Sequence, residues 1–543
     1  MNLTPIDAAR FRDELRERWY REGWYTPRTL IDEFDLGAAT RPDAELVFAS
    51  DTRPDRMTLT DLQRESREAA AAFQGLGVEK GDVIVIQVPH SREGIVALYA
   101  GLIVGAVVVP VVHIYGPSEL AFILRQSRAK MLIVPDRWRN IDFLTRVEAL
   151  PELPDLRQVV VIGDDVPADA VAWSGLPSRV RGPFLPPEIR SDDVCIMVYT
   201  SGTTADPKGV QHTHNSFRCE MQSAPHNAGE EVEHSFLATF PAGHIGGLIT
   251  QTRLSFVGSK IVIMDAWNPD TAARLIAEHA ITIAGGTPFF LDGLLTAAER
   301  NGSDVSSLRE FRVSAASVPP SLVERAVAAG ILTYRAYGSS EHPTISSGSA
   351  TDPPETRIGT DGRLVTGVEI RLVGDDLEDV AAGQDGEIVS RGPDLFAGYL
   401  DSQLDADAFL DGGWFRTGDV GRLYGGFLTI TDRKKDIIIR GGENISSKEV
   451  EDILARHPAV ADAAAAAVPD ATYGERVCAF VILHEGATLD LAEIGRHFVS
   501  SGVAKHKTPE RLVFVDELPR TPAGKVKKFE LREAYASRLS VTR

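Results

Sequence analysis

Residues 199–210 read Tyr199-Thr200-Ser201-Gly202-Thr203-Thr204-Ala205-Asp206-Pro207-Lys208-Gly209-Val210. They follow an apolar run, residues 194–199, which predicts a buried strand. Hydroxyl and backbone N–H groups at this density, together with a glycine and a lysine, are what a polyphosphate group requires. A Walker A loop is excluded, because Pro207 stands where a glycine should precede Lys208 and Gly209 replaces the Ser/Thr ligand of magnesium. The stretch therefore predicts a phosphate-binding loop of another type.

The length, charge and cysteine content of the chain limit the classes of protein to which such a loop could belong. The chain has 543 residues, which is too long for one compact core, so at least two domains are expected. Lys and Arg number 57 against 77 Asp and Glu, a net charge of −20. Nucleic acid needs a basic footprint and is therefore excluded as a partner, whereas a phosphate site needs only local positive charge. Three distant cysteines, with no apolar secretory signal expected at the N-terminus, favour a reducing, cytoplasmic compartment.

The order of predicted elements indicates the fold class. A helical pattern over residues 62–76 and apolar strands at 83–88, 130–134 and 159–162 predict parallel sheets covered by helices. From about Asp361 short strands with tight turns predict a small antiparallel β module, and the pattern changes again after Thr431. The expected fold is α/β: a large N-terminal domain with this module (1–431), followed by a small α+β domain (436–543).

Two segments raise the question of membrane contact. Residues 95–112 are apolar and long enough to span a bilayer, but internal Gly and Pro and a β-branched second half favour a core helix that runs into a buried strand. The charged helix predicted at residues 11–20 carries aromatic residues and fits either a membrane-surface or lid element, or packing against its own domain. We favour packing; no transmembrane segment is expected, and peripheral membrane contact stays open.

The 199–210 string resembles the phosphate-binding signature of the adenylate-forming (ANL) superfamily. That superfamily includes acyl-CoA synthetases, aryl-CoA ligases, adenylation domains that load carrier proteins, and beetle luciferase. Further family signatures follow in the same order over roughly residues 55–530. The resemblance implies a two-step reaction with ATP, Mg²⁺ and coenzyme A. A carboxylic acid becomes an acyl-AMP with release of pyrophosphate, and a thiol then takes the acyl group.

The resemblance also implies a nucleotide site. In the family's pattern Tyr337 lies on the adenine, Ser340 faces the α-phosphate, Glu341 and Thr200 hold Mg²⁺, and Asp419 accepts both ribose hydroxyls. A carboxylate has two oxygens to offer a vicinal diol, which makes the last assignment physically reasonable. The other nucleotide-site residues implied in this way are Ser201, Gly202, Thr203, Thr204 and Lys208 of the loop, Ala315, Ala316 and Ser317 of a small-residue wall, and Gly338 and Ser339.

The remaining implied residues concern catalysis and domain motion. His244, in the segment 240–247, stands at the substrate-gating position, and Lys525, within Thr521-Pro-Ala-Gly-Lys525, stands at the position of the catalytic lysine. A positioned ammonium and Mg²⁺ offset the repulsion between a carboxylate and a triphosphate. Thr200, Glu341, His244 and Lys525 are therefore the expected catalytic residues. The family's hinge falls on residues 432–435 with Lys435 as pivot, Arg433 approaches the nucleotide, and Gly441 and Gly442 form the pantetheine tunnel.

Several alternatives stay open after this comparison. The acceptor is either free coenzyme A or a carrier protein, because the aromatic N-terminal helix is similar to that of aryl-acid-activating enzymes. An amino-acid-activating domain is disfavoured, since no Asp or Glu lies between Glu233 and Asp265 to pair a substrate ammonium. A catalytically inactive nucleotide-binding protein or a luciferase-like oxygenase has less support. A homodimer also stays open.

The acid itself is not determined by the fold. Residues 285–290 and Ala315 indicate an apolar pocket of moderate size. The segments 339–343 and 440–444 resemble those of medium-chain or cyclohexanecarboxylate-type CoA ligases.

Overall fold

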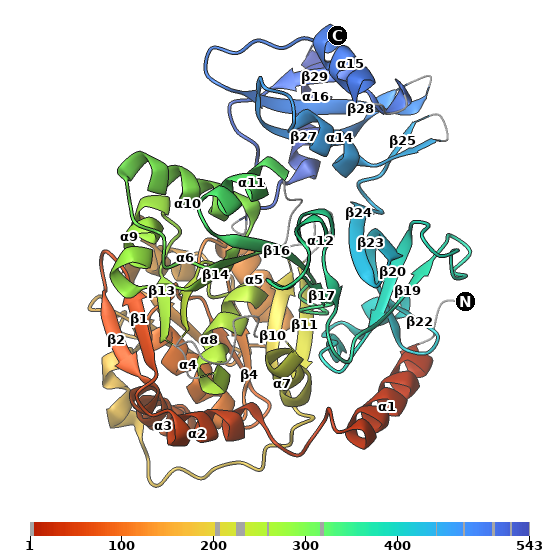
Figure 1. The fold of residues 1–543 in the computed structure, drawn as a ribbon. Coiled ribbons are helices and arrows are strands. Elements are labelled where there is room, and N and C mark those ends of the chain that lie inside the picture. Colours follow the sequence, from red (N-terminus) through yellow and green to blue (C-terminus); the bar gives the residue numbers. More distant parts are fainter. Residues whose placement is uncertain are drawn as a thin grey trace.

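The computed structural model describes residues 5–200, 207–223, 234–257, 260–314, 320–440, 443–470, 473–501, 505–521 and 524–541. In this part of the chain two large sheets and their helices build the first four-fifths, and a smaller sheet builds the rest. The C-terminal unit sits above the large one at the top of Figure 1. This arrangement confirms the expected α/β class with a small second α+β unit.

The eight-stranded sheet carries the phosphate-loop segment. It is parallel from β9 to β10, and the last two pairings, β10 with β11 and β11 with β21, are antiparallel. Its strands in spatial order are β21 (Gly398–Tyr399), β11 (Lys208–Thr213), β10 (Val194–Thr200), β4 (Val107–Pro110), β3 (Val83–Ile86), β5 (Met131–Pro135), β8 (Gln158–Ile162) and β9 (Val171–Ala172).

The second large sheet has fourteen strands and changes character along its width. Its half from β1 to β16 is parallel apart from the edge strand β2, and its half from β16 to β19 is antiparallel. The strands in spatial order are β19 (Glu369–Val373), β20 (Gly386–Arg391), β23 (Trp414–Tyr424), β24 (Phe427–Arg433), β18 (Arg363–Leu364), β17 (Ser346–Ser347), β16 (Leu332–Tyr337), β15 (Glu310–Ser314), β14 (Ile283–Gly286), β12 (Ser235–Ala238), β13 (Lys260–Met264), β1 (Glu45–Ala49) and β2 (Asp55–Thr58), with β22 (Phe409–Leu410) beside β23. The antiparallel module expected after Asp361 is therefore hydrogen-bonded into the main sheet.

The helices of the large domain form three layers around these two sheets. The largest core lies between the sheets and joins strands of both to α2 (Leu30–Thr40), α3 (Leu59–Gly75), α4 (Arg92–Ile103) and α8 (Ile245–Val257). The outer face of the fourteen-stranded sheet packs on α9 (Pro269–His279), α10 (Pro288–Asn301) and α11 (Pro320–Ala328). The outer face of the eight-stranded sheet packs on α5 (Pro117–Gln126) and α6 (Phe143–Glu148).

The two segments that raised the membrane question are both part of the folded domain. Residues 95–103 of α4 are all buried, and the chain continues into the buried strand β4, as the sequence predicted. In helix α1 (Pro5–Glu22) the Trp19 side chain is only 3% exposed, and Arg12 and Arg18 form ion pairs with Asp405 and Glu369. Among the described residues, no helix combines the length and the apolar character needed to cross a bilayer.

The C-terminal unit has its own sheet and core. Its strands are β26 (Glu443–Ile445), β25 (Ile438–Arg440), β28 (Gly474–Leu483), β27 (Val460–Asp470) and β29 (Arg511–Phe514), and its helices are α14 (Ser447–Leu454), α15 (Leu491–Ser500) and α16 (Lys528–Val541). The alanine run 463–467 lies in β27 and pairs residue by residue with β28, although alanine favours helix in isolation. Burial against α14 and α16 overrides that preference here.

We predict that the aromatic stack between α2 and α4 contributes strongly to stability. The Phe34 and Tyr99 rings lie 4.1 Å apart at their centroids and are buried, so Phe34→Ala should cost about 3–5 kcal/mol. Leu36→Ala on the same helix is the control, since Leu36 is 45% exposed and should cost at most about 0.5 kcal/mol. Urea unfolding followed by far-UV circular dichroism compares the two; equal midpoints would contradict this description of the core.

Candidate active site

One cavity of about 1730 Å³ gathers the residues to which the sequence motifs pointed. It is bounded by the β10–β11 hairpin, strands β14 to β16, helix α8 and the C-terminal segment 520–529. Ser201–Thr204, Ala315–Ser317, Gly441 and Gly442 lie outside the described residues. All the other residues assigned from the motifs line the cavity: Thr200, Lys208, His244, Tyr337, Gly338, Ser339, Ser340, Glu341, Asp419, Arg433, Lys435 and Lys525.

The phosphate-loop segment leaves from the end of an antiparallel hairpin. Thr200 ends β10 and lies directly opposite Lys208, which begins β11. The Lys208 ammonium lies 5.0 Å from the centroid of the Tyr399 ring. The Thr200 hydroxyl and the Lys208 ammonium thus belong to residues that line the cavity on either side of the predicted phosphate-binding loop.

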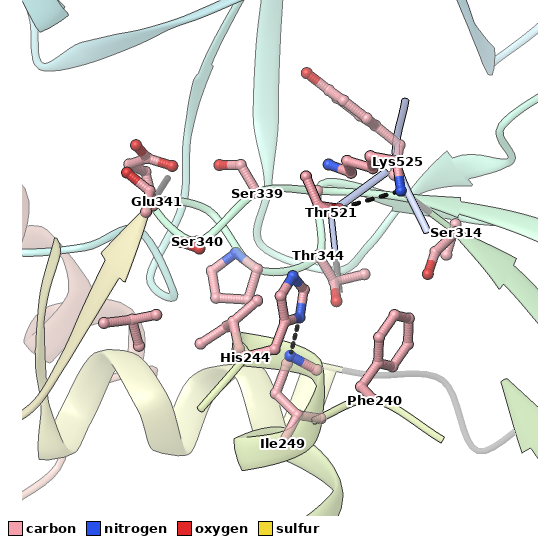
Figure 2. Close-up of a pocket in the computed structure, with 18 of the residues that line it drawn as sticks. Phe240, His244, Ile249, Ser314, Ser339, Ser340, Glu341, Thr344, Thr521 and Lys525 are labelled. Carbon is pink, nitrogen blue, oxygen red and sulfur yellow. Dashed lines mark hydrogen bonds between the residues drawn. The ribbon is translucent and has the colours of Figure 1, made fainter. Parts of the chain in front are cut away.

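A tight turn after β16 presents the next three side chains. Gly338 is required there, because a Cβ atom would lie 2.0 Å from the Pro343 carbonyl oxygen. The Ser339 N–H donates to the His342 carbonyl at 2.9 Å, and the buried His212 ring contacts the Ser340 carbonyl at 2.8 Å. These contacts hold Ser339, Ser340 and Glu341 in fixed directions along one side of the cavity (Figure 2).

The Glu341 carboxylate has a partner that sequence reasoning missed. The Tyr399 hydroxyl donates to Glu341 Oε1 at 2.8 Å, and a carboxylate with one such hydrogen bond keeps the capacity to bind further groups. Tyr399 is in β21, and no pattern in the sequence indicates its contact with Glu341. The Phe396 N–H, just before β21, donates to the Glu341 carbonyl at 2.8 Å and brings the two segments together.

Asp419 is held by two contacts at the other end of the cavity. Its Oδ2 accepts a hydrogen bond from the Tyr337 hydroxyl at 2.8 Å, and its Oδ1 pairs with Arg433 Nε at 2.9 Å. The side chain is only 6% exposed. Since each carboxylate oxygen can accept two hydrogen bonds, Asp419 keeps the capacity to receive a diol.

Lys525 reaches the cavity from the C-terminal unit (Figure 2). A turn presents it: Gly524 has a φ of +82°, the Thr521 N–H donates to the Lys525 carbonyl at 2.7 Å, and the Lys525 N–H donates to Thr521 Oγ1 at 3.1 Å. Burial and then the nearby Arg433 charge lower the pKa of Lys525 to about 8. The Lys525 side chain is therefore mostly protonated near pH 7, and it loses its proton as the pH rises through about 8.

His244 forms part of the floor below Lys525 in Figure 2. Its ring stacks on Phe240 with centroids 5.3 Å apart, and its Nδ1 accepts the Gly246 N–H at 3.2 Å. Burial and then the Lys525 charge lower the pKa of His244 to about 4. The imidazole is therefore neutral at pH 7, which suits packing against a substrate more than proton transfer.

The two units are joined by a short segment beside the cavity. Strand β24 of the large sheet ends at Arg433, and β25 of the C-terminal sheet begins at Ile438. Lys434 pairs with Asp375 and Glu387 of the large domain. Burial and then the Arg433 charge lower the pKa of Lys435, which also lines the cavity.

The far end of the cavity differs from the apolar pocket expected from residues 285–290. Ionisable side chains enter it from two helices and a strand, among them Glu220, Arg253 and Arg312. Arg312 could have been found from the alternation Glu310-Phe-Arg312-Val-Ser314, which places charged residues on the face of Ser314. Glu220 and Arg253 carry no comparable signal, because the direction of a helical side chain depends on how its helix packs.

Comparison with known proteins agrees with this site. The AMP-binding enzyme family model matches residues 34–400, and the model of the AMP-binding enzyme C-terminal domain matches residues 449–525. A medium-chain fatty-acid–CoA ligase of Escherichia coli is 33% identical over 539 residues, which cover 98% of this chain and 94% of the relative. A 2,3-dihydroxybenzoate-AMP ligase of Bacillus subtilis is 29% identical over 97% of both chains.

Solved structures agree as well. The crystal structure of an anthranilate CoA ligase with anthranoyl-AMP superposes with a TM-score of 0.84 at 25% identity, covering 95% of this chain and 98% of the other. Family motifs, relatives and fold thus lead to one assignment. The chain belongs to the AMP-binding enzyme family, within the adenylate-forming superfamily that its motifs resemble.

Proposed function

We propose that the protein activates a carboxylic acid as its acyl-AMP and then transfers the acyl group to coenzyme A. The observation that carries this function is the convergence of Glu341, Asp419 and Lys525, from three distant parts of the sequence, on one cavity. Each has a separate task in such a reaction: metal binding, ribose binding and charge neutralisation. A binding protein without catalysis would have no need of all three.

In the proposed nucleotide position the ribose lies on Asp419 and the adenine on the Tyr337 side. The triphosphate then runs along Ser339 and Ser340 towards Thr200 and Lys208. Hydroxyl and ammonium groups along this path are suitable donors to phosphate oxygens.

The residues present also suit Mg²⁺. Among the described residues no three His, Cys, Asp or Glu side chains form a metal-binding group. Mg²⁺ in nucleotide sites needs only one or two protein ligands besides phosphates and water, so the Glu341 carboxylate and the Thr200 hydroxyl would hold it. When bound, it would draw charge from the phosphate oxygens.

In the first step a carboxylate oxygen of the acid attacks the α-phosphorus of ATP. An O–P bond forms, the bond to the β-phosphate oxygen breaks, and pyrophosphate leaves. We assign to the Lys525 ammonium the stabilisation of the charge that accumulates between the two anions. His244 and Phe240 form the wall against which the acid lies and exclude water from the mixed anhydride.

In the second step the thiolate of coenzyme A attacks the acyl carbon, a C–S bond forms, and AMP leaves. We propose that the C-terminal unit (436–543) first rotates about the 432–435 segment, with Lys435 as pivot. The unit's separate core and the short connection from β24 to β25 support such a motion. Rotation would withdraw Lys525 and bring the segment that contains Gly441 and Gly442 to the cavity.

Carrier-protein loading is the second candidate for the acceptor. The Bacillus subtilis relative is named an AMP ligase, whereas the Escherichia coli relative is named a CoA ligase. The higher identity to the CoA ligase favours free coenzyme A. An assay of pyrophosphate release with a panel of acids, with and without coenzyme A, tests both steps; an adenylate that free coenzyme A never consumes would indicate the carrier protein.

We place this reaction in the cytoplasm. All three cysteines are free and buried, which is typical of a reducing compartment. Burial raises the pKa of the Cys195, Cys219 and Cys478 thiols, so none of them is poised as a nucleophile.

Lys525→Ala should separate the two steps. Loss of the ammonium should reduce acyl-AMP formation at least about 100-fold, whereas supplied acyl-AMP should still be converted to thioester. Pyrophosphate release and thioester formation from synthetic acyl-AMP measure the two. Exposed Lys505→Ala in the same unit is the control. An equal loss in both steps would contradict the role given to Lys525.

The pH profile of the first step should follow Lys525. Because its pKa is lowered to about 8 and the charged form is the active one, kcat/KM should fall as pH rises above 8, towards tenfold per pH unit. Lys525→Arg keeps its charge at these pH values and should lose this fall while having lower activity throughout. If kcat/KM fell in the same way above pH 8 in the unmodified enzyme and in Lys525→Arg, the fall would belong to another group.

Tyr399→Phe should weaken the use of Mg²⁺. The lost 2.8 Å hydrogen bond leaves Glu341 less well oriented, so the Mg²⁺ concentration for half-maximal rate should rise about tenfold. The rate at saturating Mg²⁺ should change far less. Tyr424→Phe, at a side chain 80% exposed, is the control. An unchanged Mg²⁺ dependence would show that Tyr399 does not position the carboxylate.

A further inference from the structure

Three neighbouring strands build one wall of the cavity beyond Ser314. In β15 the alternating side chains divide: Phe311 and Val313 enter the apolar core on the outer face, while Glu310, Arg312 and Ser314 line the cavity. The parallel register places Gly285 of β14, Arg312 of β15 and Tyr334 of β16 side by side. Gly285 has no side chain, so no neighbouring side chain from β14 covers Arg312 on the side of the cavity.

Two helices supply the opposite side of this region. Glu220 of α7 (His214–Ser223) is 1% exposed and accepts a hydrogen bond from the Thr344 hydroxyl at 2.8 Å. Arg253 of α8 has its guanidinium carbon 5.0 Å from the Phe236 ring centroid. Both side chains line the same cavity as Arg312.

Further contacts join these groups into one cluster. The Tyr334 hydroxyl donates to Glu310 Oε2 at 2.8 Å, and the Arg312 guanidinium carbon lies 5.9 Å from the Tyr334 ring centroid. Burial raises the pKa of Glu220, and burial together with the Arg312 charge lowers the pKa of Arg253 to about 10. Near pH 7 Arg253 therefore keeps its charge, and the protonated form of Glu220 is favoured.

The side chains of this cluster have partners within the protein, and they also line the cavity. A saturated chain or an unsubstituted ring that covered them would exclude water from charged groups without offering a hydrogen bond in return. Such a ligand gains about 25 cal/mol per Å² only against apolar walls. The region therefore complements a polar ligand group.

We propose that the Glu220–Arg253–Arg312 region selects carboxylic acids that carry a second, hydrogen-bond-accepting oxygen group at the end remote from the reacting carboxylate. This substrate class deepens the proposed function and rests on it. Guanidinium groups only donate hydrogen bonds, so the complementary group is an acceptor: a carboxylate, a carbonyl or a hydroxyl oxygen.

The strand also sets the length of the acid. Ser314 ends β15 and lines the cavity together with Lys525, so we take it as the marker of the reacting end. Arg312 is two residues further along β15, which corresponds to about 7 Å at about 3.3 Å per residue. A para-substituted aromatic acid or a chain of about six carbons fits this spacing.

Matched acids test the proposal on the unmodified enzyme. Two series serve: hexanoate, 6-hydroxyhexanoate and hexanedioate; and benzoate, 4-hydroxybenzoate and benzene-1,4-dicarboxylate. In at least one series the oxygenated acids should exceed the plain acid at least about 100-fold in kcat/KM for pyrophosphate release, because a buried polar site rejects a partner that cannot pair with it. The two series distinguish a chain from a ring, and the hydroxyl and carboxylate members distinguish the terminal group.

Variants locate the preference. Arg312→Met should reduce the ratio of oxygenated to plain acid to below about 10, by lowering kcat/KM for the former and raising it for the latter. Arg312→Lys should keep part of the ratio. Arg274→Met on α9 is the matched control, because it removes only an exposed ion pair with Glu278 on the surface. This variant should leave the ratio unchanged. The ratio is measured within each folded variant, so a general loss of activity does not imitate the result.

Two outcomes separate this proposal from the function on which it rests. Pyrophosphate release with the plain acid at equal or higher kcat/KM in both series, or a ratio unaffected by Arg312→Met, would overturn the substrate class while leaving the ligase function intact. No pyrophosphate release with any acid of either series would count against the adenylation reaction itself, together with the substrate class.

Discussion

The main constraint on this site is the repulsion between two negatively charged substrates. A carboxylate must approach a triphosphate, and two unit charges of the same sign about 4 Å apart repel by about 4 kcal/mol in an environment of intermediate polarity. We propose that the Lys525 ammonium offsets this repulsion; it comes from a separate unit, on the turn at Gly524. Because the unit that carries the lysine is joined by only a few residues, the same charge could be withdrawn once the anhydride has formed. Activation and transfer thus share one cavity.

The sheets explain why distant motifs meet there. The β10–β11 hairpin holds Thr200 opposite Lys208, and the β23–β24 pair places Asp419 beside Arg433. A backbone hydrogen bond from Phe396 to Glu341 brings the segment of Tyr399 to Glu341. Each contact is fixed by backbone hydrogen bonds, so the site is largely arranged before substrates bind. Such preorganisation reduces the reorganisation needed as charge develops during the reaction. The three helical layers around the two sheets supply the rigidity that this requires.

Much of this could be predicted from the sequence, for a definite reason. Thr200, Glu341, Asp419 and Lys525 stand within strings that resemble family motifs, so the strings identified four residues that the structure gathers in one cavity. The α/β class followed from hydrophobic periodicity. The polar end of the acid pocket did not follow, because the directions of Glu220 and Arg253 depend on helix packing between two sheets. Nor did the pairing of β16 with β17, which merges the antiparallel strands with the main sheet, or the strand formed by alanines 463–467.

The most direct test of this account is a crystal structure of the protein with Mg²⁺ and an ATP analogue whose α,β-bridging oxygen is replaced by carbon. The account predicts the ribose on Asp419, the triphosphate between Ser340 and the Thr200–Lys208 hairpin end, and the α-phosphorus open on the side of Lys525 and His244. A nucleotide bound elsewhere, with this channel closed or its α-phosphorus shielded from Lys525, would contradict it.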